Sequence, residues 1–213
     1  MKNTGYIKSV LDGTELVVDN LVKKASLKMP KEYEYDKFIK GLRKVKDQGS
    51  TSMCVAYSLS YVLESMEYMA DNDTKFQLDK KEIYGIRQDK KREGMQIKEA
   101  LAYVKKHGYS VSRKTNEVHK IRNYGLLKSV EAIKRSILMN GPCIFALPVA
   151  NSNNKHFWDG NQIIGGHAVA CIGYNEEGFI IINSWGSSWG DGGYTTLPYN
   201  ETNKLLEAWA IIK

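Results

Sequence analysis

The sequence has too few cysteines for a disulfide framework. Its 213 residues contain three of them, Cys54, Cys143 and Cys171. Small secreted domains held together by disulfides carry many more, so this count favours a reducing compartment. No CxxC pair and no cluster of His and Cys has the spacing of a zinc site. We therefore expect neither a metal nor a cofactor.

Long apolar runs are missing as well. No stretch of the chain approaches the roughly 18 apolar residues that cross a bilayer. The first 20 residues are polar and lack the apolar segment and small-residue cleavage site of a secretory signal. These absences predict a cytoplasmic protein with no membrane partner.

Charge of one sign does not dominate the chain. Lys and Arg number 31 against 24 Asp and Glu, which gives a net charge of +7. The basic residues are dispersed and no nucleic-acid-binding motif accompanies them, so we expect no nucleic-acid partner. Nothing in the sequence signals oligomerisation, and a monomer is expected.

The pattern of apolar residues divides the chain into three parts. Residues 1–28 form a polar arm with one short strand expected at 15–18. Apolar residues then recur with the helical period, and after Gly141 the pattern changes to short apolar runs separated by turn residues. The helices are expected over 54–69, 96–106 and 129–141. The strands are expected over 143–149, 167–174, 178–183, 192–198 and 207–213. Helices followed by strands indicate an α+β fold, with two lobes and a cleft between them.

Cys54 falls in the first turn of the first predicted helix, with Ser52 as the expected N-cap. Backbone N–H groups and the helix dipole favour a thiolate at such a position. A structural thiol buried in the core remains the alternative for a cysteine considered by itself.

A catalytic thiolate also needs a base, a group that orients the base, and donors for the developing oxyanion. The sequence offers a candidate for each. His167 follows two glycines at the head of an apolar strand, and Asn183 ends the next strand. Gln48 lies six residues before Cys54 and can supply an amide N–H beside the backbone N–H of Cys54.

Three blocks of sequence carry a specific resemblance. QGSTSMC, GGHAVACIGY and FIIINSWGSSWGDGGY occur in the order found in papain-like cysteine proteases, which the chain resembles over residues 29–213. The third block is the most selective, because two Trp, an Asn, a Tyr and several Gly stand at fixed offsets. The resemblance implies the papain-like two-lobed fold. It places a helical N-terminal lobe at about 45–128 and an antiparallel, β-barrel-like C-terminal lobe at about 129–213, with the active site between them.

The resemblance also implies a role for each candidate residue. Cys54 matches the nucleophile, His167 the general base and later acid, and Asn183 the residue that holds the imidazole. Gln48 matches the oxyanion-hole donor. Trp185 matches the indole that shields the Asn–His hydrogen bond from water, where that bond is worth more. Trp189 is expected to pack beside it and to line the primed side of the cleft.

The sequence departs from the family pattern around the nucleophile. The family signature C-G-[SA]-C-[WY] agrees only at Cys54, because Thr51, Ser52, Met53 and Val55 occupy its other positions. The spacing from the cysteine to the histidine is also shorter than the usual 130–150 residues or so. Lost loops and lost disulfides account for these differences, and none removes a catalytic group. We expect Ser52 and Met53 to leave a substrate room to reach the thiol.

The resemblance places the substrate pocket as well. Ile97, Ala146 and Ala168 would line the second subsite, with the backbone of Gly94 or Met95 facing an extended peptide. An apolar preference is expected there, the alternative being that Ile97 and Ala146 are ordinary core residues.

These observations predict a cysteine peptidase that acts on proteins or peptides through an acyl-enzyme. Two alternatives stay open: a transpeptidase or acyl transferase using the same triad, and an inactive homologue that binds peptides or a partner protein. Residues 1–28 are too short for the long helical propeptide of secreted relatives. They could inhibit or dock, but an extension that closes the fold is favoured.

Overall fold

The structure is a computed structural model that describes residues 4–23, 27–35, 45–71, 76–110 and 118–213. The parts of the predicted arm at 1–3 and 24–26 lie outside these ranges. The helices are α1 (Asp19–Lys23), α3 (Cys54–Asp71), α4 (Lys80–Gly85), α5 (Ile97–Lys106), α6 (Val130–Asn140) and the 3-10 helix η1 (Tyr199–Lys204). The strands are β1 (Tyr6–Ile7), β2 (Tyr33–Glu34), β3 (Met95–Gln96), β4 (Tyr109–Ser110), β5 (Val118–His119), β6 (Asn123–Leu126), β7 (Cys143–Val149), β8 (Gly165–Tyr174), β9 (Gly178–Ile182), β10 (Tyr194–Pro198) and β11 (Glu207–Ile212).

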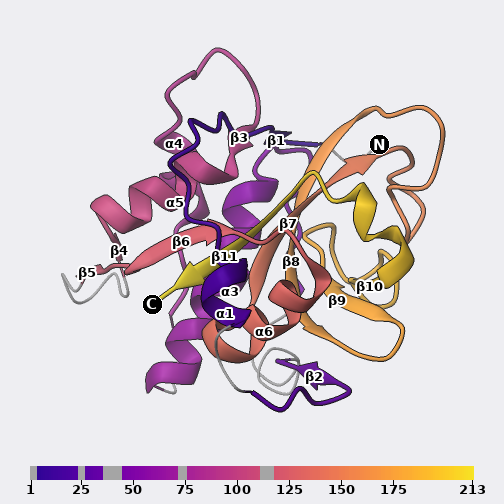
Figure 1. Cartoon of the computed structure of the whole chain (residues 1–213). Coiled ribbons are helices and arrows are strands. Elements are labelled where there is room, and N and C mark those ends of the chain that lie inside the picture. Colours follow the sequence, from indigo (N-terminus) through magenta and orange to yellow (C-terminus); the bar gives the residue numbers. More distant parts are fainter. Residues whose placement is uncertain (1–3, 24–26, 36–44, 72–75, 111–117) are drawn as a thin grey trace.

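Helix α3 is the central helix and packs against the sheet through β8 (Figure 1). It begins at Cys54, as its apolar stripe predicts, and the stripe is buried. The expectation that Ser52 caps this helix is wrong. The carbonyl of Met53 accepts the first helical bond, from Tyr57 N, whereas the Ser52 hydroxyl donates to Glu93 at 2.6 Å.

The other predicted helices are also found. Helix α5 buries Ile97, Ala100, Leu101 and Val104 on one face. Helix α6 is capped by Ser129, whose hydroxyl oxygen accepts a hydrogen bond from Ala132 N.

A sheet of seven strands forms the other half of the molecule. Its order is β10-β9-β8-β7-β11-β6, with β2 added to β8, and its neighbouring strands pair antiparallel. The longest strand, β8, lies between β7 and β9 and begins at Gly165, so that His167 comes near its start. The predicted strand at 15–18 is wrong. Only Val17 forms an isolated bridge there, to Leu126.

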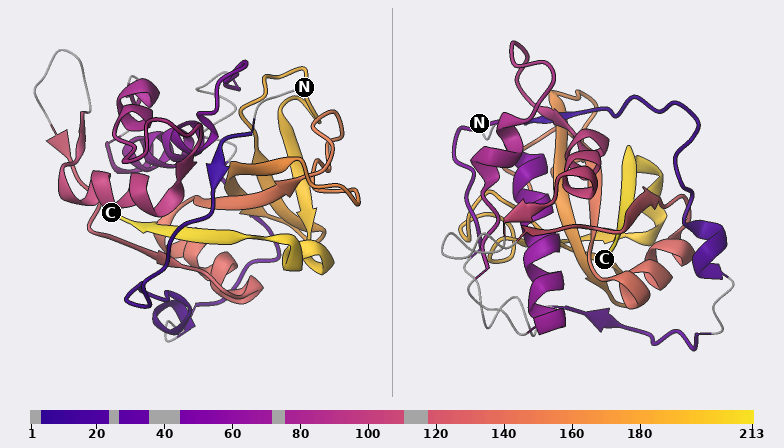
Figure 2. Two further views of the ribbon diagram at one scale, coloured as in Figure 1. Left: turned by 90° about the horizontal axis from the view of Figure 1, so that it is seen from above. Right: turned by 90° about the vertical axis from the view of Figure 1, so that its left-hand side faces the viewer.

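The start of the N-terminal segment passes between three of the helices and part of the sheet. In the left view of Figure 2, the first part of this segment (indigo) runs between α3, α4 and α5 on one side and the orange strands on the other. The predicted α+β arrangement is therefore confirmed. Among the described residues, no helix is both long enough and apolar enough to cross a membrane.

Candidate active site

The Cys54 thiol lies where the first turn of α3 meets the start of β8. Its side chain is fully buried. The backbone amides of Ala168, the residue after His167, and of Gly5 face the thiol, and both lower its pKa. Helix α3 and strand β8 therefore bring Cys54 and the chain segment at His167 together, although they are far apart in sequence.

His167 is held by Asn183. The imidazole Nε2 lies 2.7 Å from Asn183 Oδ1, and both side chains are fully buried. The same oxygen accepts the backbone N–H of Ser184 at 2.7 Å, so this atom of the amide is the acceptor. Nε2 must then carry the proton, which leaves Nδ1 as the basic nitrogen. Among the described residues, Nδ1 has no hydrogen-bond partner.

Three aromatic side chains enclose this hydrogen bond. Trp185 stacks on the His167 ring, with 4.3 Å between centroids and 25° between planes. Trp189 packs edge-on against Trp185 at 5.3 Å, and its indole N–H donates to the carbonyl of Ser152. Phe157 meets both the His167 and Trp185 rings edge-on. Exclusion of water by these rings strengthens the hydrogen bond that orients the imidazole.

Gln48 is fixed next to Ser184, the residue that follows Asn183. Its backbone N–H donates to the carbonyl of Ser184, and its Oε1 accepts the Ser184 hydroxyl at 2.7 Å. Its Nε2 donates to the carbonyl of Thr51 at 2.7 Å. An amide nitrogen carries two N–H groups, and this bond uses one of them. The side chain is thus held rigidly on the loop that leads into Cys54.

Burial favours the neutral forms of both reacting groups in this arrangement. It raises the pKa of the Cys54 thiol to about 11, against which the surrounding backbone amides act in the opposite direction. It lowers the pKa of His167 to about 4, although the hydrogen bond to Asn183 opposes this shift. Burial therefore keeps both the Cys54 thiol and the His167 imidazole uncharged near neutral pH.

The cover is the N-terminal segment of the same chain. The backbone of Gly5 passes so close to the loop before Cys54 that an ideal Cβ on it would lie 2.1 Å from the Ser52 carbonyl oxygen. On the other side, Cβ atoms on Gly165 and Gly166 would lie 2.3 Å from Thr4 Oγ1 and 2.5 Å from Tyr6 Cδ1. Gly5 on the segment, and Gly165 and Gly166 on β8, allow residues 4–6 to lie between β8 and the loop before Cys54.

The segment continues as β1, which pairs in parallel with β3. Tyr6 is opposite Met95 and Ile7 is opposite Gln96, and Met95 N donates to the Gly5 carbonyl at 2.8 Å. Gly94 has φ +95°, and a Cβ there would come within 2.8 Å of the Gly5 carbonyl oxygen. The backbone expected to face an extended peptide, at Gly94 and Met95, thus faces residues 5–7 of the chain itself.

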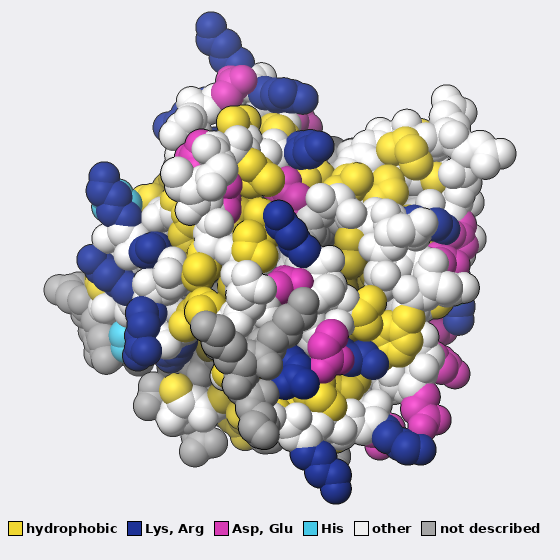
Figure 3. All heavy atoms as spheres, viewed as in Figure 1, with side chains coloured by type: hydrophobic (Ala, Val, Ile, Leu, Met, Phe, Trp, Pro, Cys, Tyr) yellow, Lys and Arg dark blue, Asp and Glu magenta, His cyan; other side chains and the backbone are white. Residues whose placement is uncertain are grey.

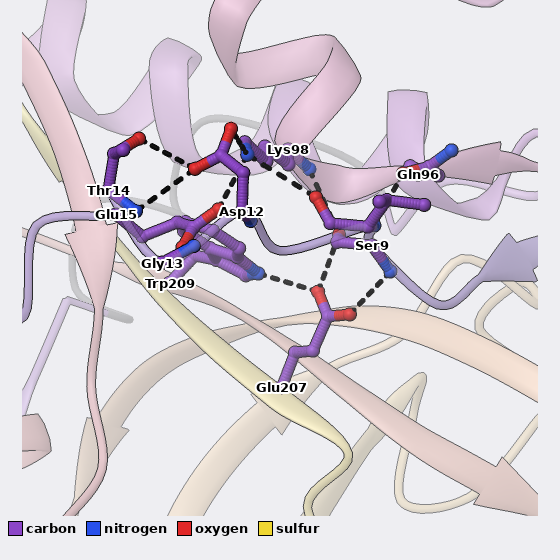
Figure 4. A network of polar contacts seen from close by, with 10 residues as sticks. Ser9, Asp12, Gly13, Thr14, Glu15, Gln96, Lys98, Glu207 and Trp209 are labelled. Carbon is purple, nitrogen blue, oxygen red and sulfur yellow. Dashed lines mark hydrogen bonds and ion pairs between the residues drawn. The ribbon is translucent and has the colours of Figure 1, made fainter.

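Side chains beyond β1 fasten this segment, which we call the cleft segment (residues 4–10). Ser9 donates to Glu207 through its backbone N–H at 2.6 Å and its hydroxyl at 2.8 Å, and Val10 N donates to Gln96 at 2.9 Å. Just past it, Lys98 Nζ forms ion pairs with Asp12 at 3.1 Å and Glu15 at 2.5 Å. Figure 4 shows these two sets of contacts side by side.

Two of the three residues predicted to line the second subsite are neighbours in the sheet. Ile97, Ala146 and Ala168 are all fully buried, and Ala146 pairs directly with Ala168 across β7 and β8. The next residue in this row is Glu207, which pairs with Ala146 across β11 and β7. The hydroxyl of Tyr6 donates to Glu207 Oε1 at 2.7 Å. Tyr6 therefore reaches from Gly166 into this part of the site.

Sequence reasoning missed three features of this site. Phe157 lies in a polar loop, where nothing in the local pattern connects it with His167. Glu207 stands at the start of a predicted strand, a position that is usually solvated. The cleft segment lacks both a helical and a strand period. The one available signal was Gly5 together with the Gly165–Gly166 pair, because glycines permit close approach of a second backbone.

No group of three or more His, Cys, Asp or Glu in the described part of the chain could hold a metal ion. The face shown in Figure 3 intersperses its Lys and Arg side chains with hydrophobic, acidic and uncharged polar ones.

Comparison with known proteins agrees with this arrangement. The sequence model of the papain family cysteine protease matches residues 29–209. The chain belongs to the papain family of cysteine proteases.

Individual relatives match only part of this chain, at modest sequence identity. An uncharacterized peptidase C1-like protein of Acanthamoeba polyphaga mimivirus is 36% identical over 99 residues, which is 38% of this chain and 31% of that protein. The cathepsin B-like cysteine proteinase 3 of Ostertagia ostertagi is 31% identical over 94 residues, covering 39% and 53%. The matched part thus spans about a third to a half of the length of these two relatives.

Solved structures share the fold. Xylellain, a cysteine protease from Xylella fastidiosa, superposes with a TM-score of 0.79 at 19% identity, covering 100% of this chain and 96% of that one. A cysteine protease of Carica candamarcensis in complex with E-64 gives a TM-score of 0.68 at 22% identity, covering 87% and 99%. The predicted papain-like two-lobed fold is confirmed.

Proposed function

We propose that this chain is a cysteine peptidase whose nucleophile is Cys54 and whose base is His167. The observation that carries the proposal is the fixed tautomer of the imidazole. Asn183 Oδ1 accepts the N–H of His167 Nε2, so His167 Nδ1 is left as the basic nitrogen. The next residue, Ala168, directs its backbone amide at the Cys54 thiol.

The chemistry follows from these roles. Nδ1 takes the thiol proton, and the thiolate attacks the carbonyl carbon of a peptide bond. The N–H groups of Gln48 and of the Cys54 backbone stabilise the oxyanion. The imidazolium returns its proton to the departing amine, which leaves a thioester on Cys54. His167 then activates a water molecule that hydrolyses the thioester and restores the thiol.

We further propose that the cleft segment holds this peptidase in a latent form. The segment runs in the direction opposite to that of a substrate. In a substrate, the residue at the second subsite precedes the scissile bond. Here Gly5 lies at Cys54, and Tyr6, which reaches Glu207, follows it. Reversed in this way, the segment blocks the site without offering a peptide bond in the cleavable orientation.

We propose a cytosolic location, because the three cysteines are free and buried, as is usual in a reducing compartment. The two lobes at about 45–128 and 129–213 are proposed as parts of one peptidase domain, preceded by the arm at 1–28. The domain would act on peptides as a monomer.

An epoxysuccinyl peptide, which alkylates activated thiolates, tests the function. The full-length chain and the variant Gly5→Val, in which the added side chain collides with the Ser52 carbonyl, are treated and analysed by mass spectrometry. We expect slow labelling of the wild type, fast labelling of Gly5→Val at Cys54, and none after His167→Ala is added.

Turnover separates the candidate activities. Gly5→Val should hydrolyse fluorogenic peptides, with water as the acceptor. A product that appears only when an amine is supplied would favour the transferase. A folded Gly5→Val variant that binds peptides, but neither labels at Cys54 nor turns over, would favour the inactive homologue.

A further inference from the structure

We propose that Tyr61, a residue of the central helix, positions the imidazole of His167. Its hydroxyl fixes the peptide group between Asn183 and Ser184, and this peptide in turn fixes the amide oxygen that binds the imidazole. The inference rests on the proposed peptidase function and adds a positioning residue to it. Tyr61 acts through Asn183 and takes no part in the making or breaking of bonds.

Tyr61 belongs to the same helix as the nucleophile. It lies seven residues after Cys54 on α3, which is about two helical turns, so the two side chains project from the same face of the helix. Tyr61 is only 2% exposed and is among the largest buried side chains of the protein. The helix that carries the thiol therefore also carries a hydroxyl group into the interior.

This hydroxyl joins two segments of the site. It accepts the backbone N–H of Lys46 at 2.6 Å and donates to the carbonyl of Asn183 at 3.3 Å. The first contact lies on the segment that leads to Gln48, and the second lies on the residue that holds the imidazole. Asn183 follows the last residue of β9, and among the described residues the Tyr61 hydroxyl is the group that donates to its carbonyl. Helix α3 is thereby bonded to both segments.

The Asn183 carbonyl matters because the same peptide group provides the N–H of Ser184. In a planar trans peptide the C=O and N–H point in opposite directions, so a donor on the carbonyl sets the direction of the N–H. That N–H donates to Asn183 Oδ1 at 2.7 Å, and the same oxygen accepts the N–H of His167 Nε2 at 2.7 Å. A path of hydrogen bonds thus leads from Tyr61 through one rigid peptide to the imidazole. Bonds arranged in series also strengthen one another by polarisation.

The ring that carries the hydroxyl is itself held in place. Lys46 Nζ lies 4.2 Å from the centroid of the Tyr61 ring and forms an ion pair with Glu64 at 2.6 Å. The same ammonium donates to the Ser60 hydroxyl at 2.7 Å. Burial raises the pKa of Tyr61, so its hydroxyl stays protonated. The Asn183 carbonyl therefore faces a donor at a fixed point.

Kinetics on an opened protein test the role. Reacting groups must be held within about 0.5 Å of the productive geometry, so a lost constraint on the imidazole affects rate more than substrate binding. Tyr61→Phe removes the hydroxyl and keeps the ring in the core. In full-length Gly5→Val, we expect Tyr61→Phe to lower kcat for fluorogenic peptides about tenfold and to change KM less than about twofold.

Tyr35→Phe is the matched control. Tyr35 is also buried, and its hydroxyl also donates to a backbone carbonyl, that of Ile137 in α6, at 2.8 Å. This variant loses the same kind of hydrogen bond away from the site, so it should leave kcat and KM unchanged. An unchanged kcat in Tyr61→Phe would overturn the proposal. Equal losses of kcat in the two variants, or a raised KM with kcat retained, would do the same.

Nuclear magnetic resonance separates this proposal from the proposed function. The proton on His167 Nε2 is observed in the wild-type chain with isotopically labelled histidine, and it is identified by its absence from His167→Gln. Tyr61→Phe should shift this signal and speed its exchange with water, whereas Tyr35→Phe should leave it in place. A shifted signal in a protein that hydrolyses no peptide would support the positioning role and refute the peptidase. Hydrolysis combined with an unshifted signal in Tyr61→Phe would do the reverse.

Discussion

The backbones of Gly5 and Ser52 lie so close together that a Cβ on Gly5 would stand 2.1 Å from the Ser52 carbonyl oxygen. Any side chain at residue 5 must therefore displace the cleft segment or the loop that carries Cys54. The loop runs directly into the buried helix α3, and Gln48 ties it to Ser184. The segment is the part expected to move.

A graded series at residue 5 follows from this contact. Gly5→Ala and Gly5→Val should raise the rate of Cys54 alkylation by iodoacetamide in that order, with at least about a tenfold increase for Val, equivalent to about 1.4 kcal/mol. Gly85→Ala is the matched control, since a Cβ on Gly85 meets nothing within 4 Å. Unchanged alkylation in a folded Gly5→Val variant would mean that the segment does not control access to the thiol.

The pH dependence of Cys54 alkylation should also reveal that the cleft segment covers the thiol. With the pKa of Cys54 at about 11, the wild-type thiol is protonated at neutral pH, and its alkylation should increase up to that pH. In Gly5→Val, solvent and His167 stabilise the charged pair, so the reactive form should appear at a much lower pH. Alkylation rates measured from pH 5 to 11 on both proteins test this, and coinciding profiles would contradict it.

The same two groups affect stability at opposite ends of the pH scale. The pKa of His167 is lowered to about 4, so the unfolded chain binds a proton more readily below pH 6.5, and stability falls as the pH drops through that range. The Cys54 pKa is raised from 9 to about 11, so stability also falls as the pH rises from 9 towards 11. Thermal unfolding is measured against pH for the wild type and both variants. Cys54→Ser should remove the loss of stability above pH 9, and His167→Gln should remove the loss below pH 6.5.

Gln48 should matter for rate more than for binding. In the opened Gly5→Val protein, Gln48→Ala is expected to lower kcat by about 10²-fold with little change in KM, because the oxyanion forms only in the transition state. Ser184→Ala removes the hydroxyl that Gln48 Oε1 accepts but keeps the amide, and it serves as a control for the lost hydrogen bond. Equal effects of the two substitutions would mean that Gln48 acts only by holding the loop.

Local pattern predicted much of this fold. The stripe of Val55, Leu59, Val62 and Leu63 is enough to define α3, because a helix buries one face whatever it packs against. The apolar runs likewise define β7, β8 and β9, because these strands lie inside the sheet and are buried on both of its faces. The N-cap of α3 was mistaken because Ser52 had a distant partner, Glu93, that a local pattern does not contain.

The parts of the site that escaped prediction depend on contacts between distant segments. Glu207 has a polar side chain at a strand end, and it is contacted there by Tyr6 and Ser9, which come from the other end of the sequence. Phe157 gains its role from the rings of His167 and Trp185, which come from two other segments. The favoured reading of residues 1–28, as an extension that closes the fold, did not foresee that part of them crosses the thiol.

The attachment of the cleft segment has one more consequence. Beyond Asp12 and Glu15, the chain is anchored again where Val18 N donates to the Leu126 carbonyl and α1 packs on α6. A blocking segment tethered this closely keeps an effective concentration on the order of millimolar at the site, however dilute the protein is. Its release is a unimolecular event, and a free peptide enters the cleft only during the fraction of time that the segment is away.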